Sequence, residues 1–313
     1  MNTFFLLFAG LVLTLFSRLP GDRPETAGGA DIIGKIKTVH VIPRILMDSL
    51  PDEISESSGL LLWRGLIWTQ NDSGGEPVLY GIDLKKKKIV KRIVVENAYN
   101  HDWESLAQDE HFIYIGDFGN NGGWRKDLCV YKIPKDRIGE GAEVHVKAEK
   151  IAFHYPEQKS FVSLPFGTRW DGEALLCLRD TLWLFTKDWK WEETQRYALT
   201  TVPGSYAARL VDSFYVKGLV TGAALSPGKT TLVLSGYESF YPYLWVFYDF
   251  PGSRFFEGKV IRVRYPEYHL AQTEGVTFLD DDTLLVSAEH SKIPGRIYAF
   301  SLKEILKKAA GEK

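Results

Sequence analysis

The chain repeats one sequence pattern five times, and this repetition limits its fold more than any other feature. Each copy begins with a glutamate or a short polar residue, continues through an alternating apolar stretch and a tight turn, and ends with a second apolar stretch. Repeats of this length are typical of architectures in which similar units pack against one another and bury a continuous core. The five copies begin at Ser58, Glu104, Glu173, Thr221 and Glu274.

The apolar stretches are short, rich in Val, Ile, Tyr, Phe and Trp, and bounded by Gly, Pro, Asn and Asp, which predicts β-strands. A third strand follows in every copy and a fourth in the first four. The fifth copy ends after its third strand at 296–302, so we expect the segment 36–46 to pair beside it and close the ring. The sequence therefore predicts an all-β, five-bladed β-propeller closed by its N-terminal strand. Six blades are the alternative, because the interval of 69 residues between Glu104 and Glu173 could hold further strands.

The N-terminal region contains an uncharged apolar run from Phe4 to Phe16, which suits a signal-peptide core and is short for a membrane-spanning helix. We expect 1–30 to be a signal peptide and linker and 31–313 to be a single propeller domain. The mature protein would then be secreted or periplasmic, with no stable membrane span; an uncleaved anchor is the alternative. The two cysteines, Cys129 and Cys177, lie in strand-like apolar runs, which indicates buried thiols, with one disulfide as the alternative.

Charge and motifs exclude several classes of function. The 38 basic and 40 acidic residues give a net charge of −2 at pH 7, whereas a nucleic-acid-binding protein needs a basic excess. The sequence contains no GxSxG, HExxH or P-loop motif. We therefore expect a monomer whose partners are small molecules, glycans or peptides rather than nucleic acid.

The residues that open the five repeats are candidate metal ligands. In a propeller the innermost strand of each blade begins at one mouth of the central channel, so these five side chains would converge there. Three glutamates this close would repel one another, and a hard cation such as Ca²⁺ would compensate their charge. We expect Ser58, Glu104, Glu173, Thr221 and Glu274 to bind calcium; a wide, solvated channel that tolerates the carboxylates without an ion is the alternative.

The loop after each second strand returns to the same mouth, so its residues are candidate ligand-binding groups. Asp117 and Glu289 are also the candidates for a general base. Aromatic side chains in the loops 186–197 and 236–245 suit stacking on a sugar or a peptide, or else cap the apolar layers between blades. The candidate ligand-binding residues are Asn71, Asp72, Asp117, Arg125, Lys187, Tyr237 and Glu289.

The order of the repeat openers, Ser, Glu, Glu, hydroxyl, Glu, resembles that of the apyrase-type calcium-activated nucleotidases. The SSGLL segment and TEGVTF, which starts at Thr273, look like the corresponding pieces of that family. The resemblance implies a five-bladed propeller with a calcium ion in its channel. It is confined to the repeat openers and does not extend to the nucleotide-contacting loops of that family.

A resemblance to a second group covers most of the chain. NDSGGEPVLYGID, DWESLAQDEHFIYIGDFGNNGGWRKDLCVYKI, VTGAALSPGKT and QTEGVTFLDDDTLLVSAEHS are similar to exported bacterial propellers related to SdiA-regulated and phytase-like domains. This resemblance implies the fold and export but no particular activity. Three functions are therefore considered: a propeller that binds a cation and a ligand at its mouth, a calcium-dependent phosphoester hydrolase, and a protein-interaction scaffold.

Overall fold

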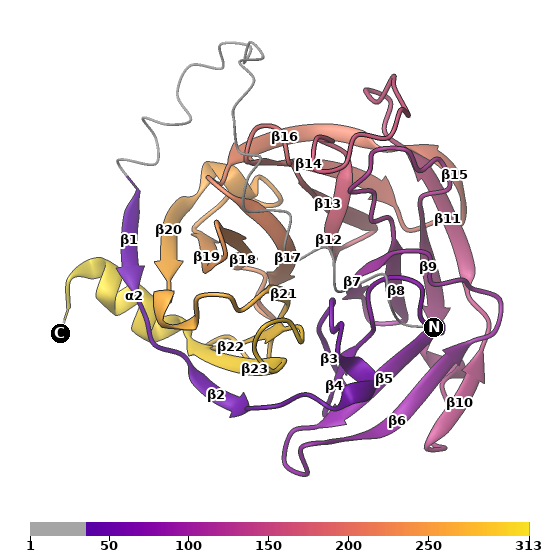
Figure 1. The fold of residues 1–313 in the computed structure, drawn as a ribbon, viewed down its shortest axis with the longest axis horizontal. Coiled ribbons are helices and arrows are strands. Elements are labelled where there is room, and N and C mark those ends of the chain that lie inside the picture. Colours follow the sequence, from indigo (N-terminus) through magenta and orange to yellow (C-terminus); the bar gives the residue numbers. More distant parts are fainter. Residues whose placement is uncertain (1–35, 313) are drawn as a thin grey trace.

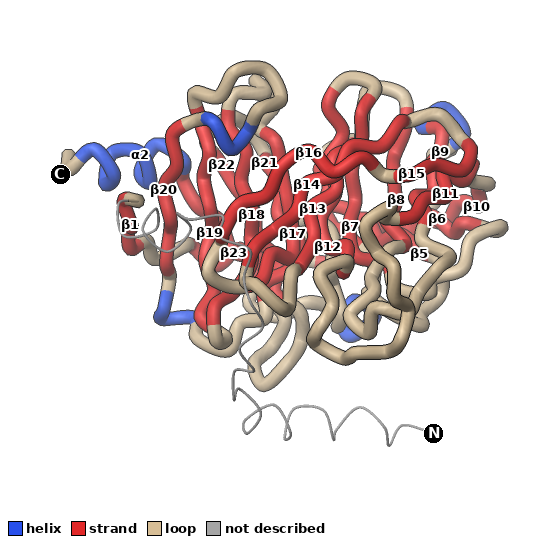
Figure 2. The backbone as a smooth tube through the Cα atoms, turned by 90° about the horizontal axis from the view of Figure 1, so that it is seen from above, coloured by secondary structure: helices blue, strands red, loops and turns tan. Residues whose placement is uncertain are grey.

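Five β-sheets arranged in a ring form the protein, as the sequence repeats predict. The computed structural model describes residues 36–312, so the expected signal peptide at 1–30 lies outside the described residues. Figure 1 looks down the ring, and Figure 2 shows from the side that the strands form a disc with loops on both faces. The predicted five-bladed β-propeller is confirmed, and no sixth sheet occurs within 36–312.

Each blade consists of antiparallel strands that follow one another from the channel outward. Blade 1 contains β3 (Leu61–Trp63), β4 (Leu66–Thr69), β5 (Val78–Asp83) and β6 (Lys88–Val95). Blade 2 contains β7 (Trp103–Gln108), β8 (Phe112–Asp117), β9 (Cys129–Pro134) and β11 (Glu149–His154). Blade 3 contains β12 (Asp171–Leu178), β13 (Thr181–Lys187), β14 (Glu193–Thr200) and β16 (Arg209–Tyr215). Blade 4 contains β17 (Leu219–Leu225), β18 (Thr231–Glu238), β19 (Tyr241–Tyr248) and β20 (Lys259–Arg264). Blade 5 contains β21 (Thr273–Phe278), β22 (Thr283–Ala288) and β23 (Arg296–Ser301).

Three blades carry an additional outer strand that the repeat pattern did not predict. These strands are β10 (Glu143–Val146), β15 (Gly204–Ala207) and β1 (Lys37–His40). Each lies parallel to the outermost strand of its blade, β6, β11 and β20 respectively. Because the edge strand of a sheet presents unpaired backbone groups, each added strand covers groups that would otherwise face solvent.

The N-terminal segment closes the ring, but only its second half does so as predicted. β2 (Arg44–Met47) pairs antiparallel with β23 and completes blade 5. The first half of 36–46 forms β1, which pairs with β20 of blade 4 and not with 296–302. Pro43 separates the two strands, and proline cannot donate a backbone hydrogen bond within a sheet. One segment therefore joins two blades.

The apolar cores lie between neighbouring blades and not in the channel. Five separate clusters of buried side chains occur, one at each of the five contacts between blades. Trp68 and Trp103, for example, lie in the cluster between blades 1 and 2. Aromatic and β-branched residues on alternate positions of the strands supply these side chains, which leaves the axis free for polar groups.

The remaining regular structure consists of short helices. The helix α2 (Leu302–Ala310) follows β23, and its first turn is capped by Ser301 Oγ, which accepts a hydrogen bond from the Glu304 backbone. The single-turn helices are η3 (Asp52–Ile54), η4 (Lys135–Arg137), η5 (Phe255–Glu257) and η6 (Pro266–Tyr268). Among the described residues no helix has the length and hydropathy to cross a membrane.

Cys129 and Cys177 are both free thiols. Cys129 is buried, as the sequence predicts, whereas Cys177 is half-buried.

Candidate functional site

Four of the five residues that open the repeats lie at irregularities in strand pairing. Glu104 is the extra residue between the paired Trp103 and Ser105. Glu173, Thr221 and Glu274 occupy the equivalent register shifts of β12, β17 and β21. A β-bulge changes the direction of its side chain relative to the regular alternation of a strand. The four bulges thus mark the mouth end of four inner strands.

A small residue follows each opener because the inner strands nearly touch. A Cβ atom on Gly59 would lie 2.7 Å from the backbone nitrogen of Leu106 in the next blade. A Cβ atom on Gly275 would lie 2.5 Å from the carbonyl oxygen of Ser58. Even a methyl group at either glycine would push the inner strands apart. The residues that follow the openers are Gly59, Ser105, Ala174, Gly222 and Gly275.

The two hydroxyl openers connect neighbouring blades. Ser58 Oγ donates a hydrogen bond of 2.7 Å to the carbonyl oxygen of Glu104. Thr221 Oγ1 donates to the carbonyl oxygen of Thr273, also at 2.7 Å. Both hydroxyls were predicted as calcium ligands, and in the structure their protons are used to join inner strands.

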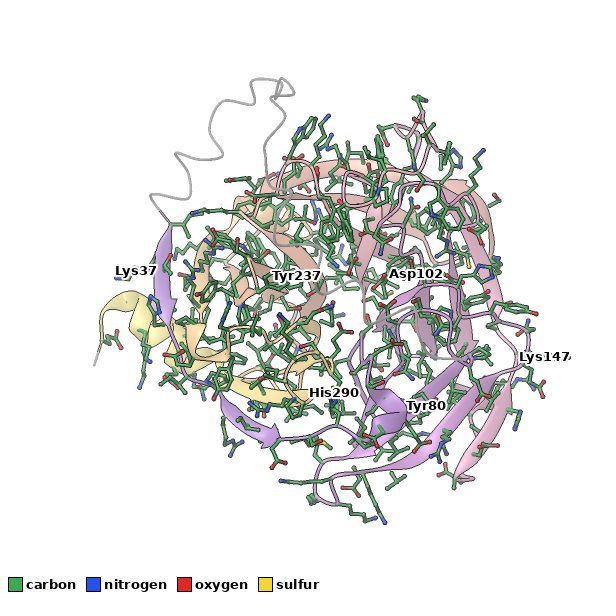
Figure 3. All side chains as sticks on the ribbon, viewed as in Figure 1. Lys37, Tyr80, Asp102, Lys147, Tyr237 and His290 are labelled. Atoms are coloured by element: carbon green, nitrogen blue, oxygen red, sulfur yellow. The ribbon has the colours of Figure 1, made fainter. Side chains whose placement is uncertain are left out.

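Two overlapping groups of carboxylates occupy the mouth on the side of blades 1 to 3. Asp72, Asp102 and Glu104 offer oxygen atoms that all lie within 4.8 Å of one another. Glu104, Asp171 and Glu173 form the second such group. Glu104 therefore belongs to both. Asp102 is labelled near the centre of the ring in Figure 3, and Tyr237 of blade 4 lies in the same central region.

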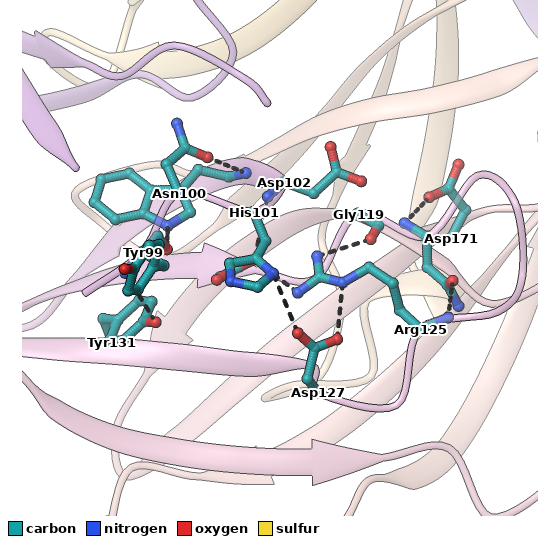
Figure 4. Close-up of polar contacts among 12 residues, drawn as sticks. Tyr99, Asn100, His101, Asp102, Gly119, Arg125, Asp127, Tyr131 and Asp171 are labelled. Carbon is teal, nitrogen blue, oxygen red and sulfur yellow. Dashed lines mark hydrogen bonds and ion pairs between the residues drawn. The ribbon is translucent and has the colours of Figure 1, made fainter. Parts of the chain in front are cut away.

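The second group is neutralised by protein atoms. Lys187 Nζ lies 2.9 Å from Glu173 Oε1. Asp171 accepts hydrogen bonds from the backbone of Asn120 at 2.6 Å and from Trp189 Nε1 at 2.7 Å. Figure 4 labels Asp171 and draws its hydrogen bond as a dashed line. These donors satisfy the two carboxylates without an external ion.

In the first group Asp72 and Asp102 share a side-chain hydrogen bond, but no residue in 36–312 forms an ion pair with the group. Glu104 is 7% exposed, and its carboxylate has no hydrogen bond or ion pair with any residue in 36–312. Asp72 Oδ1 is likewise buried without a hydrogen-bond partner among these residues. A buried carboxylate without donors is unfavourable unless a proton or a cation compensates it. The group of Asp72, Asp102 and Glu104 is therefore the place at the mouth where a proton or a cation is most needed.

Gly119 brings a backbone segment directly against this group. A Cβ atom at this position would lie 2.2 Å from Glu104 Oε1 and 2.4 Å from Asp102 Oδ2. The Gly119 N–H donates to the carbonyl oxygen of Asp102, and its own carbonyl oxygen accepts from Arg125 at 3.0 Å. Figure 4 shows Arg125 between Gly119 and Asp127. Only glycine leaves room for the two carboxylates here.

Burial and mutual repulsion raise the pKa values of these carboxyl groups. Burial, reinforced by neighbouring carboxylates, raises the pKa of Asp102 to about 8 and that of Asp72 to about 7. Burial also raises the pKa of Glu274 to about 7, although Lys187 opposes this. The pKa of Glu104 is held well above its ordinary value by burial, Asp72 and Glu173. The mouth holds more acid groups than its single buried lysine can neutralise.

The ion-free protein should lose stability as the pH rises from about 5 to 8. Unfolded Asp and Glu titrate near 4, whereas three folded-state carboxyl groups titrate at about 7 to 8. Between these values the unfolded chain binds fewer protons, so stability falls as the pH rises and the loss is complete above the folded-state pKa values. We expect a loss on the order of 3 kcal/mol over this interval. Urea unfolding in the presence of a chelator measures it. An unfolding free energy that is flat or rises from pH 5 to 8 would contradict the assignment.

The structure engages several other predicted ligand-binding residues in contacts within the fold. Asp117 is ion-paired with Arg125 at 2.9 Å, and both side chains are buried. The amide of Asn71 donates to the carbonyl oxygen of Glu53 at 2.7 Å. Tyr237 and Glu289 lie half-buried at the mouth. Burial, reinforced by Glu274 and Asp72, raises the pKa of Glu289 well above its usual value, so Glu289 belongs electrostatically to the carboxylate site.

Sequence reasoning missed Asp102 and Asp171, although a local signal marks both. Asp102 precedes Glu104 by two residues in D-W-E, and Asp171 precedes Glu173 by two residues in D-G-E. In an extended strand residues i and i+2 share a face. The repeated D-x-E pattern at the start of two inner strands therefore identifies the carboxylates that accompany Glu104 and Glu173.

Comparison with known proteins supports the propeller fold but identifies neither a family nor a function. No protein-family model matches the sequence, and a search of curated proteins finds no match. The PQQ-bound aldose sugar dehydrogenase of Streptomyces coelicolor aligns with a TM-score of 0.51 over 83% of this chain and 98% of its own, at 10% identity. A glucose dehydrogenase aligns with a TM-score of 0.47 over 81% and 98% of the two chains, at 9% identity. A luciferin-regenerating enzyme aligns with a TM-score of 0.46 over 83% and 95%, at 8% identity. The likeness is one of fold.

Proposed function

We propose that this propeller binds a calcium ion through Asp72, Asp102 and Glu104 and receives a small or polymeric ligand at the same mouth. The observation that carries the proposal is Glu104, a buried carboxylate that has no donor among the described residues and that two groups of carboxylates share. A divalent cation would replace the missing donors and remove the repulsion among the three groups. Two other predicted ligands remain close enough to affect the site: the charge of Glu173 raises the pKa of Glu104, and the charge of Glu274 raises the pKa of Asp72.

The donor set favours a hard cation. The two carboxylate groups offer oxygen atoms alone, with neither histidine nor cysteine among their members. Calcium takes six to eight oxygen ligands in flexible geometry, whereas zinc prefers nitrogen and sulfur. Water and ligand oxygens would complete the coordination. The ion would thus connect the protein to whatever enters the mouth, and it would hold the carboxylates in their ionised form.

Calcium titration by calorimetry tests the proposal directly. The full chain should bind calcium, and Gly119→Ala should weaken this binding at least tenfold because the new methyl group would displace Glu104 and Asp102. Gly75→Ala is the matched control, because a Cβ atom there would meet no atom closer than 3.7 Å. No heat of binding in the unmodified protein, or equal affinity in the two alanine variants, would show that the ion does not bind here.

Phosphoester hydrolysis is the second function considered, and the geometry supports it less. A hydrolase would need cationic side chains free to hold phosphate. Arg125 is already paired with Asp117 and Asp127, and Lys187 with Glu173. Asp117, one of the two candidate bases, is occupied by Arg125, which leaves Glu289 for this role.

Export to the periplasm or cell exterior and a monomeric state also remain proposals, supported by the apolar run at 4–16 and by the closed ring.

A further inference from the structure

The strongly exposed aromatic side chains of the described chain all lie at the mouth, four on loops and Tyr241 at the first position of β19. The loops that join β6 to β7, β8 to β9, β11 to β12 and β18 to β19 all end at the face where the inner strands begin. Exposed aliphatic side chains occur both at the mouth and elsewhere. Val162 and Leu164 lie on the loop that carries Phe166, whereas Ile42, Val202 and Leu210 lie on other parts of the propeller. The exposed aromatic residues are Tyr99, Trp124, Phe166, Phe240 and Tyr241.

Two of these aromatic residues are held in a backbone conformation that disfavours them. Phe166 has φ of +56° and Phe240 has φ of +66°, in the left-handed region where glycine and asparagine are comfortable and bulky residues are rare. Burial of the rings offsets little of this strain, because Phe166 is 43% and Phe240 is 48% exposed. Exposed rings in a strained conformation are typical of binding sites, where the surrounding structure holds them for a purpose other than packing.

The two strained rings belong to aromatic pairs on either side of Lys187. Phe166 packs edge to face against Trp189, with ring centroids 4.8 Å apart. Phe240 lies parallel to Tyr237. Lys187 Nζ is 5.2 Å from the ring of Trp189 and 5.8 Å from the ring of Tyr237. Trp189 also donates to Asp171, which connects this aromatic pair to the carboxylates of the mouth.

We propose that the mouth binds an oligosaccharide, with sugar rings stacked on these aromatic pairs. A sugar ring has apolar C–H faces and a rim of hydroxyl groups. Aromatic faces match the C–H faces, while carboxylates accept hydrogen bonds from the hydroxyl groups. This inference rests on the proposed role of the mouth in ligand binding, but the stacking itself does not require the calcium ion. The carboxylate acceptors close to these rings favour a hydroxyl-rich sugar over a lipid chain.

Binding to a defined glycan panel tests the inference. The full chain would be titrated with oligosaccharides of glucose, mannose, galactose, N-acetylglucosamine and galacturonic acid, each with calcium and with chelator. We expect binding to at least one of them, and Phe166→Asn and Phe240→Asn should each weaken it at least tenfold. Asparagine tolerates the left-handed backbone, so these variants remove the ring and keep the loop. Val202→Asn, at a 57% exposed aliphatic residue on the connection between β14 and β15, should leave affinity unchanged.

The outcomes separate this inference from the calcium proposal. Sugar binding that persists in chelator, together with no calcium binding, would refute the ion and retain the oligosaccharide. Calcium binding with no affinity for any sugar of the panel would retain the ion and overturn the oligosaccharide. Equal sugar affinity in the unmodified protein and both asparagine variants, or binding to phosphatidylcholine vesicles in place of sugars, would also overturn it.

Discussion

Met47→Asp is expected to unfold most of the protein, whereas Ile45→Asp on the same strand is expected to change little. Met47 is 1% exposed and packs in the core between blades 5 and 1, while Ile45 is 38% exposed. Losing a buried methionine costs about 2–5 kcal/mol, and burying a carboxylate costs more. The sum is comparable to the whole stability of a domain, about 5–15 kcal/mol.

The two variants lie on the same strand, so comparing them separates damage to the core that β2 covers from damage to the strand β2 itself. Denaturant unfolding should give a strongly reduced or absent transition for Met47→Asp and a change below about 1 kcal/mol for Ile45→Asp. If both variants unfold at the same denaturant concentration as the unmodified protein, the contact of β2 with β23 does not hold the ring closed. If both are equally destabilised, the damage lies in the strand itself and not in the core it covers.

The propeller could be predicted because its signal is carried by spacing. Five similar segments at regular intervals require five similar units, and the missing fourth strand of the last unit indicates closure by the N-terminus. The pairing of β1 could not be predicted in the same way. Residues 37–40 and 44–47 are both short apolar-polar segments, and either could join an open strand edge. Which segment pairs with β20 and which with β23 depends on where these two strands lie in the folded ring.

The candidate site was predicted in part, because register shifts do not appear in a sequence pattern. The repeats identified Glu104, Glu173 and Glu274, and the structure places them at one mouth. They did not show that Lys187 lies against Glu173, or that the carboxylates of Asp102 and Glu104 meet beside Gly119. These contacts depend on bulges and on loops packed from neighbouring blades, which involve residues distant in sequence.

The aromatic loops divide between the two explanations that the sequence left open. Tyr243 is buried, and the ring of Trp191 lies 3.5 Å from the guanidinium of Arg169, so these two residues serve the fold. Phe240 and Tyr241 are exposed at the mouth. The loop composition is the same in each case, and the distinction arises from whether the side chain points between blades or toward solvent. Sequence alone does not contain this direction.

Glu104→Gln is expected to abolish stabilisation by calcium without harming the ion-free protein. Calcium at 100 times its dissociation constant should stabilise the unmodified protein by about 2.7 kcal/mol. The glutamine removes one ligand charge, so this gain should disappear. In chelator at pH 8 the variant should match or exceed the unmodified protein, because a neutral side chain relieves the repulsion that raises the pKa of Asp72 and Asp102.

Glu173→Gln supplies the contrast, because the two glutamates differ in their partners. Glu173 is paired with the buried Lys187, so its replacement leaves that ammonium without its closest counter-charge. Breaking a buried pair in this way costs on the order of 3 kcal/mol, so Glu173→Gln should be destabilised in chelator while Glu104→Gln is not. Thermal unfolding of both variants with calcium and with chelator gives the four values needed. A calcium-dependent shift that survives in Glu104→Gln, or equal destabilisation of both variants in chelator, would rule out Glu104 as the ligand on which the ion depends.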